Sequence, residues 1–339
     1  MVTSRSNPIH VVAGVIRDAH GRVLLGQRGE GRHLAGMWEF PGGKVDAGET
    51  PDAALVRELD EELGVIVRHS RPLIAVEHSY PSRRIRLDVH EVLEVEGVPV
   101  GREGQPLRWV RPDDMHRIPM PDADRPVVAA LRLPPALVIT PEPDTIDIFL
   151  ADFERTLAGG ARWVQFRARS MSATTLAELA PRLLALGRRH HARIVINGPP
   201  ELALDLGLDG VHLDARRLAA LSRRPLPAEL WVGASCHDRA ALEHAAALGL
   251  DYATLSPLRR TASHPQVEPL GWERFAALRE GVPLPVYALG GMQPQDLDEA
   301  RRHGAQGVAG IRAFWRSSAS SQVSAQDCTI QAGMTRHVP

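Results

Sequence analysis

The stretch from Gly42 to Val65, GGKVDAGETPDAALVRELDEELGV, constrains this chain more than any other. It reads as a glycine-rich turn followed by a short helix. Thr50 is a favourable N-cap, and Pro51 suits the first helical position, where its missing N–H is not needed. Gly64 favours the end of a helix. We therefore predict a helix that begins after Thr50 and ends near Gly64.

This helix is predicted to have an apolar and an acidic side. The residues that recur at helical spacing and are predicted to face a core are Val56, Leu59 and Leu63. Glu58, Glu61 and Glu62 share another side, where like charges repel one another. Arg57 is the only basic residue of the helix. Clustered carboxylates without matching cations are what Mg²⁺ requires, since it binds carboxylates together with substrate phosphates. A solvated acidic face is the alternative interpretation.

The spacing of the fixed residues decides between these interpretations. The stretch resembles the signature of the Nudix hydrolases at every fixed position, namely Gly43, Glu49, Arg57-Glu58-Leu59, Glu61-Glu62 and Gly64-Val65. The resemblance implies a hydrolase of nucleoside diphosphate linkages with an α/β/α sandwich fold. It also implies a Mg²⁺ cofactor, with Mn²⁺ as a possible substitute.

Composition limits the class of protein. A chain of 339 residues is too long for one ordinary domain and suits two. A net charge of −1 gives no general attraction to nucleic acid or membrane, so we expect neither as a partner. The two cysteines, Cys236 and Cys328, argue against a disulfide framework and fit a reducing cytosol. No segment reads as a signal peptide or membrane span, and we expect a cytoplasmic protein.

The first part of the chain, 1–133, alternates strand-like runs with helices. Residues 9–18 and 23–28 are apolar and β-rich, and Asp18 to Gly21 between them reads as a hairpin turn. Further strands are predicted at 71–78, 84–95 and 106–110, and a helix at 124–132. The joint Leu133-Pro134-Pro135 is rich in proline and predicts a domain boundary.

From residue 134 to 316 the pattern changes to short apolar strands separated by Ala/Leu-rich amphipathic helices. The predicted strands are 136–140, 163–168, 193–197, 210–214, 231–235, 252–256, 285–291 and 307–311. Eight β/α steps predict an α/β fold of the small TIM (β/α)8 barrel type, with an open doubly wound sheet as the alternative. The Ser-rich stretch 317–339 is predicted to be a disordered tail.

The first domain resembles the MutT type of Nudix enzyme, which hydrolyses 8-oxo-dGTP to the monophosphate and pyrophosphate and so prevents mutation. The run WEFPGGK at 38–44 is more specific than the signature alone. The resemblance implies metal ligands at the carbonyl of Gly42 or Gly43 and at Glu58, Glu61, Glu62 and Glu103. An exposed loop acid is the alternative for Glu103.

The same resemblance implies catalytic roles and a substrate site. Glu58 would orient or deprotonate the attacking water, with Arg57 and Glu61 assisting, while Glu49 closes the loop. The implied substrate-binding residues are Arg28, His33, Phe40, Lys44, Arg83 and Asp124. Arg28 would reach the phosphates or else serve surface solubility. Lys44, the only lysine of the chain, could equally be a chance survivor.

Asp124 stands where the best-known member of the family carries Asn. An amide both donates and accepts hydrogen bonds, whereas an ionised carboxylate only accepts. We therefore expect Asp124 to act as a double acceptor toward the N1–H and 2-amino edge of guanine, or to favour another purine. The alternative is an N-cap of the following helix.

The second region resembles thiamine-phosphate synthase and the related thiazole tautomerase. The implied site for a thiamine-related phosphate ligand comprises Gln165, Arg167, Arg169, Asn197, Ser235, Thr261, Gly290 and Gly291. Gly198 stands where the synthase carries a metal-binding Asp, and His264 replaces a lysine. Asp214 could substitute for a missing acid. We expect a ligand-binding or inactive barrel rather than an active synthase. The alternative is a thiamine-pathway protein that hydrolyses hydroxymethylpyrimidine pyrophosphate in its first domain or synthesises thiamine phosphate.

Overall fold

The computed structural model describes residues 7–31, 33–261 and 266–316. The first part of the chain contains the following elements: β1 (Ile9–Ile16), β2 (Val23–Gln27), β3 (Trp38–Glu39), β4 (Gly42–Lys44), α1 (Pro51–Leu63), β5 (Ile66–Tyr80), β6 (Arg83–Glu96), β7 (Leu107–Val110), the 3-10 helices η1 (Pro112–Arg117) and η2 (Asp122–Asp124), and α2 (Arg125–Arg132). The helix predicted from Thr50 to Gly64 is confirmed.

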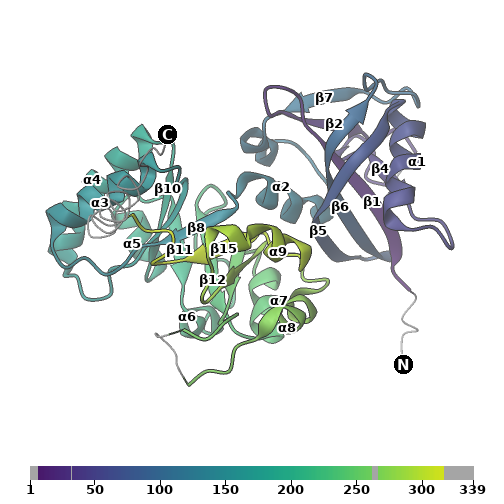
Figure 1. Cartoon of the computed structure of the whole chain (residues 1–339). Coiled ribbons are helices and arrows are strands. Elements are labelled where there is room, and N and C mark those ends of the chain that lie inside the picture. The colour runs from purple at the N-terminus through teal and green to yellow at the C-terminus, as the bar shows by residue number, and fades with distance from the viewer. Residues whose placement is uncertain (1–6, 32, 262–265, 317–339) are drawn as a thin grey trace, which may run out of the picture.

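Two sheets and two helices form this first part (Figure 1). One sheet has the order β4-β1-β6-β5, and the other has the order β3-β2-β7. Successive residues of β1 point to opposite faces: Val12 packs in a cluster with α1, and Ala13 packs in a cluster with α2. The predicted α/β/α sandwich is confirmed.

The predicted turn at Asp18 to Gly21 is confirmed, although its flanking strands hardly pair, and one prediction about the core is wrong. The chain does turn at Asp18 to Gly21, with the Gly21 amide donating to the Asp18 carbonyl over 3.0 Å. However, β1 and β2 share a single bridge, Arg17 to Val23, and then enter different sheets. Val56 does not face the core, since it is 38% exposed, whereas Leu55 is fully buried in its place. Packing against the sheet therefore decides which side of α1 faces the core.

The second part of the chain alternates strands and helices: β8 (Ala136–Ile139), α3 (Ile146–Ala158), β9 (Trp163–Phe166), α4 (Ala173–Arg189), β10 (Arg193–Asn197), α5 (Pro200–Asp205), β11 (Gly210–Leu213), α6 (Ala215–Ala219), β12 (Trp231–Cys236), α7 (Arg239–Ala247), β13 (Tyr252–Leu255), α8 (Gly271–Arg279), β14 (Val286–Leu289), η3 (Pro294–Asp296), α9 (Leu297–Arg302) and β15 (Gly307–Gly310). All eight strands predicted from apolar runs are present.

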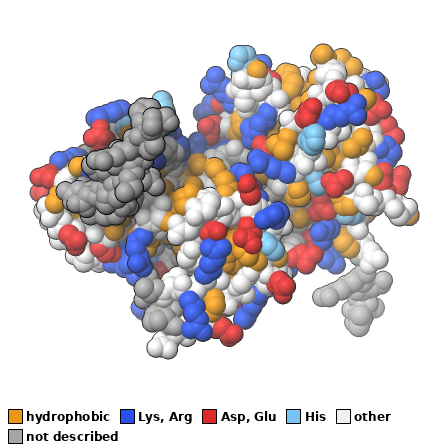
Figure 2. Space-filling model, viewed as in Figure 1, with side chains coloured by type: hydrophobic (Ala, Val, Ile, Leu, Met, Phe, Trp, Pro, Cys, Tyr) orange, Lys and Arg blue, Asp and Glu red, His pale blue; other side chains and the backbone are white. Residues whose placement is uncertain are grey.

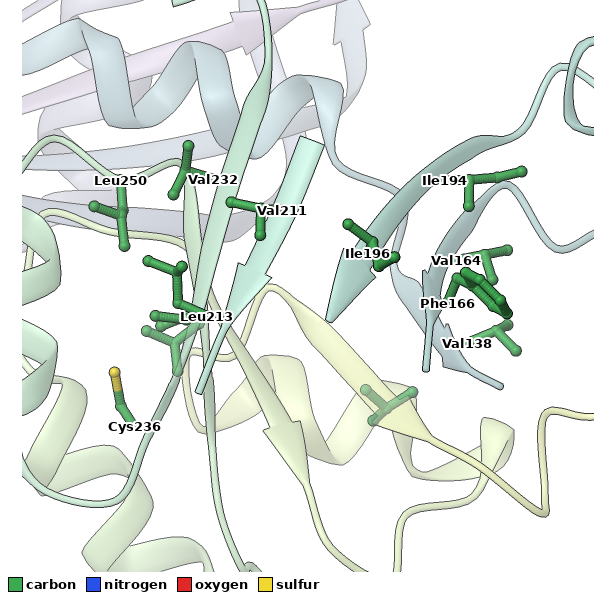
Figure 3. Close-up of a cluster of buried hydrophobic side chains, with 14 of the residues drawn as sticks. Val138, Val164, Phe166, Ile194, Ile196, Val211, Leu213, Val232, Cys236 and Leu250 are labelled. Carbon is green, nitrogen blue, oxygen red and sulfur yellow. The ribbon is translucent and has the colours of Figure 1, made fainter. Parts of the chain in front are cut away.

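These strands close into a parallel barrel in the order β10-β11-β12-β13-β14-β15-β8-β9. The small TIM barrel is therefore confirmed, and the open doubly wound sheet is wrong. Figure 3 shows part of the apolar layer between strands and helices, which includes Val138, Phe166 and Ile196. Cys236 belongs to this layer as a buried free thiol, while Cys328 and the predicted tail lie outside the described residues.

A second cluster fills the end of the barrel where the strands begin. Trp163, Tyr252 and Tyr287 are fully buried there, and their rings contact one another edge to face. Leu133, from the joint after α2, packs into the same cluster. The Tyr287 hydroxyl donates to the Pro134 carbonyl over 2.5 Å. The first domain is thus attached at the floor of the barrel, opposite the strand ends that carry chemistry in this architecture.

Charged contacts reinforce the joint. Arg132 and Arg193 both bond the Asp113 carboxylate, over 3.2 and 2.5 Å. Both guanidinium groups also lie over the Trp231 ring, at 4.6 and 5.3 Å from its centroid. Side chains of both signs are interspersed over the visible face of the molecule (Figure 2). Within the described residues, no helix combines the length and apolar character needed to cross a bilayer.

Candidate active site

The loop before α1 brings backbone and carboxylate into close contact. The Thr50 hydroxyl caps α1 by accepting a hydrogen bond from the Ala53 amide over 3.3 Å. β4 places Gly42 and Gly43 beside the helix, where a β-carbon at Gly43 would come within 2.2 Å of the Glu58 carboxylate. A β-carbon at Gly42 would lie 2.1 Å from the Val12 carbonyl oxygen. We call these two glycines the Gly42–Gly43 cradle. A larger residue at either position would displace the neighbouring carboxylate or backbone.

Arg57 links the loop to the acidic side of α1. Its Nε and Nη2 donate to Glu49, over 3.0 and 2.8 Å, and Nη2 also donates to the Lys44 carbonyl over 3.0 Å. Its Nη1 donates to Glu58 over 2.8 Å and to Glu61 over 3.3 Å. Hydrogen bonds from Arg57 hold the pKa of Glu49 below its usual value. The expected loop-closing role of Glu49 agrees with these bonds.

Glu62 has the most unusual environment on the helix. Burial, together with the charges of Glu103, Glu39 and Glu58, raises its pKa to about 7, against a hydrogen bond of 3.0 Å from the Gly42 amide. Four carboxyl groups, one of them far away in sequence, thus act on one another at this position. Glu61 lies farther out, with 59% of its side chain exposed.

A cavity of about 390 Å³ opens beside these carboxylates. Its wall includes Glu39, Glu62, Glu103 and Gln105, together with backbone of the loop after β2. The Gln105 side chain ties the Glu103 segment to α1 by accepting from the Glu103 amide and donating to the Glu62 carbonyl, over 2.9 and 3.0 Å. A volume of this size suits a ligand as large as a nucleotide.

Beyond Glu39 lies a buried acid. Arg28 contacts Glu39 through Nη1 and donates from Nε to the His33 carbonyl over 2.7 Å. Asp124 is 5% exposed, and its Oδ2 has no hydrogen-bond partner. Burial raises the pKa of Asp124 well above its usual value, and the charge of Glu39 adds to this while Arg28 opposes it.

This environment corrects one expectation for Asp124 and bears on another. The residue stands at the N-cap position of α2, but its side chain makes no capping hydrogen bond. Burial opposes ionisation of the Asp124 carboxyl, and a neutral carboxyl presents one donor and one acceptor rather than two acceptors. In hydrogen-bonding terms, neutral Asp124 is equivalent to an amide.

The other expected substrate residues lie at different depths. Phe40 is buried in the core cluster next to α2. The His33 ring contacts the Tyr80 ring edge to face at 5.6 Å, and Arg83 pairs with Tyr80 at the start of β6. The Lys44 side chain is exposed and has no polar partner among the described residues. Arg28 and Asp124 both interact with Glu39, which lines the cavity, whereas Phe40 packs in the core and Lys44 is exposed.

In the barrel, the expected ligand residues follow consecutive strands. Gln165 is buried at the end of β9, and its Oε1 has no partner. Asn197, at the end of β10, donates to the His212 carbonyl over 3.3 Å. Ser235, on β12, lies 2.9 Å from His212 Nε2, whose ring also contacts the Tyr252 hydroxyl at 3.0 Å. Burial lowers the pKa of His212 to about 3.

An acid not considered from the sequence faces the two arginines. Arg167 Nε lies 3.4 Å from Glu142 Oε1, and the Arg169 amide donates to the same carboxylate over 3.1 Å. Gly290 and Gly291 have positive φ angles and pack against Pro257 and Arg259. Thr261 makes no hydrogen bond with the described residues, and His264 lies outside them.

Asp214 does not substitute for a missing metal ligand. It caps α6 by accepting from the Arg217 amide over 2.8 Å, and it pairs with the Arg217 guanidinium.

Comparisons with known proteins agree with this geometry. A family model described as "NUDIX domain" matches residues 12–130, and one described as "Thiamine monophosphate synthase" matches residues 136–314. The 8-oxo-dGTP diphosphatase of Escherichia coli is 37% identical over 37% of this chain and 96% of that protein. The chain belongs to both families.

Other relatives extend this result. The 8-oxo-dGTP diphosphatase of Haemophilus influenzae is 42% identical over 36% of this chain and 90% of that protein. A putative thiamine-phosphate synthase of Geobacter sulfurreducens is 41% identical over 49% of this chain and 78% of that protein. The protein is thus a Nudix hydrolase joined to a barrel of the thiamine monophosphate synthase family.

The donor chemistry of the Nudix domain suits a hard divalent cation, because Glu58, Glu62 and Glu103 could supply carboxylate oxygens and the loop backbone could add carbonyl oxygens. Within the described residues, no three His, Cys, Asp or Glu side chains are grouped closely enough to hold a metal ion. Glu62 accepts a hydrogen bond from the Gly42 amide, and Glu58 accepts one from Arg57. Burial and neighbouring carboxylates raise the pKa of Glu62, and a nearby cation would oppose this effect.

Glu39 was missed in the sequence. It acts on Glu62 and on Asp124, so it lies between the acidic helix and the buried acid. The available signal was a charged residue between two aromatic ones, Trp38 and Phe40, directly before the glycine loop.

Proposed function

We propose that the Nudix domain hydrolyses 8-oxo-dGTP and related oxidised purine nucleoside triphosphates to the monophosphate and pyrophosphate, with Mg²⁺ as cofactor and Mn²⁺ as a substitute. The observation that carries the proposal is the contact of Glu58 and Glu62 with the Gly42–Gly43 cradle, beside a cavity of nucleotide size that Glu62 and Glu103 line. This activity would sanitise the nucleotide pool.

The metal site would comprise Glu58, Glu61, Glu62 and Glu103 with a carbonyl of Gly42 or Gly43. A bound divalent cation supplies charge neutralisation for the phosphates and lowers the pKa of a water molecule. Without that positive charge, the carboxylates would repel the substrate.

The residues of the chain position the proton transfer. Glu58 would accept the proton of the attacking water, because it is the carboxylate held against the cradle. Arg57 fixes Glu58 in place and is itself held by two hydrogen bonds to Glu49. Removal of any of these three residues would therefore disturb the general base.

Neutral Asp124 accounts for selection of the oxidised base. In guanine, N7 and O6 are both acceptors. In 8-oxoguanine, N7 carries a proton, so the same edge presents a donor beside an acceptor. A protonated carboxyl can donate to O6 and accept from N7–H at once. The unpartnered, buried Oδ2 of Asp124 supports this assignment.

A substrate panel on the full chain tests the proposal. We expect 8-oxo-dGTP to be hydrolysed with a kcat/KM at least a hundredfold above that for dGTP, and chelation of divalent cations to abolish turnover. Equal rates for the two nucleotides would refute the assignment of the substrate, and turnover in the presence of EDTA would refute the cofactor.

For the barrel we propose binding of a thiamine-related phosphate without synthase turnover. Gln165 and Arg167 favour a phosphate ligand, whereas Gly198 removes a metal acid and Glu142 already contacts Arg167. Thermal shift with thiamine phosphate should raise the melting temperature of the full chain. Formation of thiamine phosphate from its two precursors would contradict the loss of turnover.

A thiamine-pathway role for the Nudix domain is the alternative, motivated by the fusion itself. Hydroxymethylpyrimidine pyrophosphate in the same substrate panel tests it. A kcat/KM for this compound above that for 8-oxo-dGTP would favour the alternative.

A further inference from the structure

A pocket of about 170 Å³ lies between the two domains, away from both candidate sites. One side is formed by Arg17 directly after β1 and by residues of β5, β6 and α2 of the first domain, and the other by α9 and the segment before β15. The charged residues that line it are Arg17, Arg71, Glu91 and Arg301. None of these residues belongs to the Nudix signature or to the barrel mouth.

Two of the three arginines share one acid. Arg17 Nε donates to Glu91 Oε1 over 3.1 Å, and Arg71 donates to Glu91 Oε2 from Nε and Nη2, over 3.0 and 2.5 Å. Burial would raise the pKa of Glu91, but these arginines outweigh that effect and lower it. Glu91 is therefore ionised and fully engaged by two cations.

Arg301 brings a third positive charge into the same space. It is half-buried on α9, and its side chain forms no ion pair or hydrogen bond with the described residues. Burial lowers its pKa and the neighbouring charge of Arg71 lowers it further, against attraction from Glu91 and Asp298. Three arginines around one lining carboxylate leave an excess of about two positive charges in a partly buried space, which favours an anion.

The rest of the pocket wall is largely apolar. Leu133 and Pro135 of the joint line the pocket together with Ala305. The Gln306 side chain crosses between the domains and donates to the Ala130 and Leu133 carbonyls, over 2.9 and 3.1 Å. The pocket therefore exists only when the domains are docked. Its volume is below the roughly 300 Å³ at which sites for drug-sized ligands begin, so a whole nucleotide would not fit.

We propose that this interdomain pocket binds a small phosphate-class anion, either inorganic phosphate or pyrophosphate, through the guanidinium groups of Arg301, Arg71 and Arg17. Arginine suits this role because its planar fork donates two parallel hydrogen bonds to oxyanions. Such an anion would bridge both domains and stabilise their docking. The proposal stands independently of the reaction catalysed by the Nudix domain.

Calorimetric titration of the full chain with phosphate, and separately with pyrophosphate, tests the proposal. EDTA keeps the carboxylate site free of metal, and sodium chloride holds the ionic strength constant. We expect saturable binding that Arg301→Gln and Arg17→Gln each weaken at least tenfold. Arg302→Gln is the matched control, because Arg302 is the exposed neighbour on α9 and does not line the pocket. It should leave the Kd within twofold.

Arg167→Gln, at the barrel mouth, separates this pocket from the other candidate anion site and should also leave the Kd within twofold. The tighter of the two anions identifies the ligand. The proposal is overturned if neither anion binds saturably to the wild-type chain, if Arg301→Gln leaves the titration unchanged, or if Arg302→Gln or Arg167→Gln weakens binding as much as Arg301→Gln. If Arg301→Gln fails to fold, the wild-type titration and the Arg17→Gln variant still decide the test, because Arg17 is exposed and its substitution should not disturb folding.

Discussion

Gly43 and the carboxylate of Glu58 are in such close contact that a β-carbon at position 43 would lie 2.2 Å from the carboxylate. The glycine at this position is thus required for packing against a side chain, since no positive φ angle is recorded for it. The same carboxylate is held from the other side by Arg57 over 2.8 Å. Backbone on one side and a guanidinium on the other fix the orientation of the proposed general base.

Substitution of this glycine should impair turnover more than stability. In Gly43→Ala the added methyl group must displace the Glu58 carboxylate. We expect kcat for 8-oxo-dGTP to fall at least tenfold, because a displaced base no longer meets the attacking water in the correct geometry. The melting temperature should change by only a few degrees. An unchanged kcat would show that the position of Glu58 does not limit the reaction.

The effect on kcat of removing a carboxylate from α1 should depend strongly on the position of that carboxylate. Glu58→Gln keeps the shape of the side chain but cannot accept a proton, and we expect kcat to fall at least a hundredfold. Asp60→Asn is the control on the same helix, because the exposed Asp60 pairs with Arg102 and not with the cradle. Steady-state kinetics of both variants should show a near-normal rate for Asp60→Asn; equal losses would contradict the assignment of Glu58.

Asp124→Asn should retain selectivity for the oxidised base, since an amide presents the same donor and acceptor pair as a neutral carboxyl. The stability of the two proteins should diverge with pH. The raised pKa of Asp124 in the fold means that its stabilising contribution is present at low pH and is lost as pH rises through the folded-state pKa.

Urea unfolding at pH 5 and pH 9 measures this divergence. The free energy of unfolding of Asp124→Asn, relative to wild type, should be higher at pH 9 than at pH 5. A difference that is independent of pH would mean that Asp124 is ionised in the fold throughout this range.

His212 should contribute to acid unfolding of the barrel. Its folded pKa of about 3 lies below the ordinary value of 6.5, so the neutral ring stabilises the fold above pH 6.5 and this contribution is lost as pH falls toward 3. In His212→Gln the loss cannot occur. Between pH 7 and pH 4.5 wild type should lose about 2–3 kcal/mol more than the variant, measured by urea unfolding. Parallel curves would indicate that the ring is already protonated.

Local signals made much of the fold predictable. Thr50 and Gly64 define a helix from neighbouring residues alone, and both helix ends agree with the prediction. The barrel followed from eight short apolar runs, since strands buried on both faces are apolar throughout. In both cases the information lies within a few residues along the chain.

Features set by distant packing were not predictable. Val56 and Leu55 are equally apolar, and only the position of the sheet decides which is buried. The strands on either side of Asp18 flank a turn but separate into two sheets, because β1 pairs with β4 and β6 while β2 pairs with β3 and β7. Asp124 was expected to be ionised because its burial was unknown.

In the candidate sites, too, local sequence predicts some features and distant packing decides the others. The signature places Glu58, Glu61 and Glu62 on one helix, and the structure brings Glu103 and Glu39 to them from distant segments. Arg301 and Arg71 are separated by more than two hundred residues, and no pattern in the sequence pairs them.

The insertion of Leu133 among the aromatic rings at the base of the barrel has a practical consequence for dissecting the molecule. A cut directly after this residue would leave an exposed apolar cavity in the carboxy-terminal fragment and an exposed apolar end on the amino-terminal fragment. Both fragments would therefore tend to aggregate. The two domains are thus physically dependent on each other at a point remote from both candidate sites, because the joint lies at the floor of the barrel and not at its mouth.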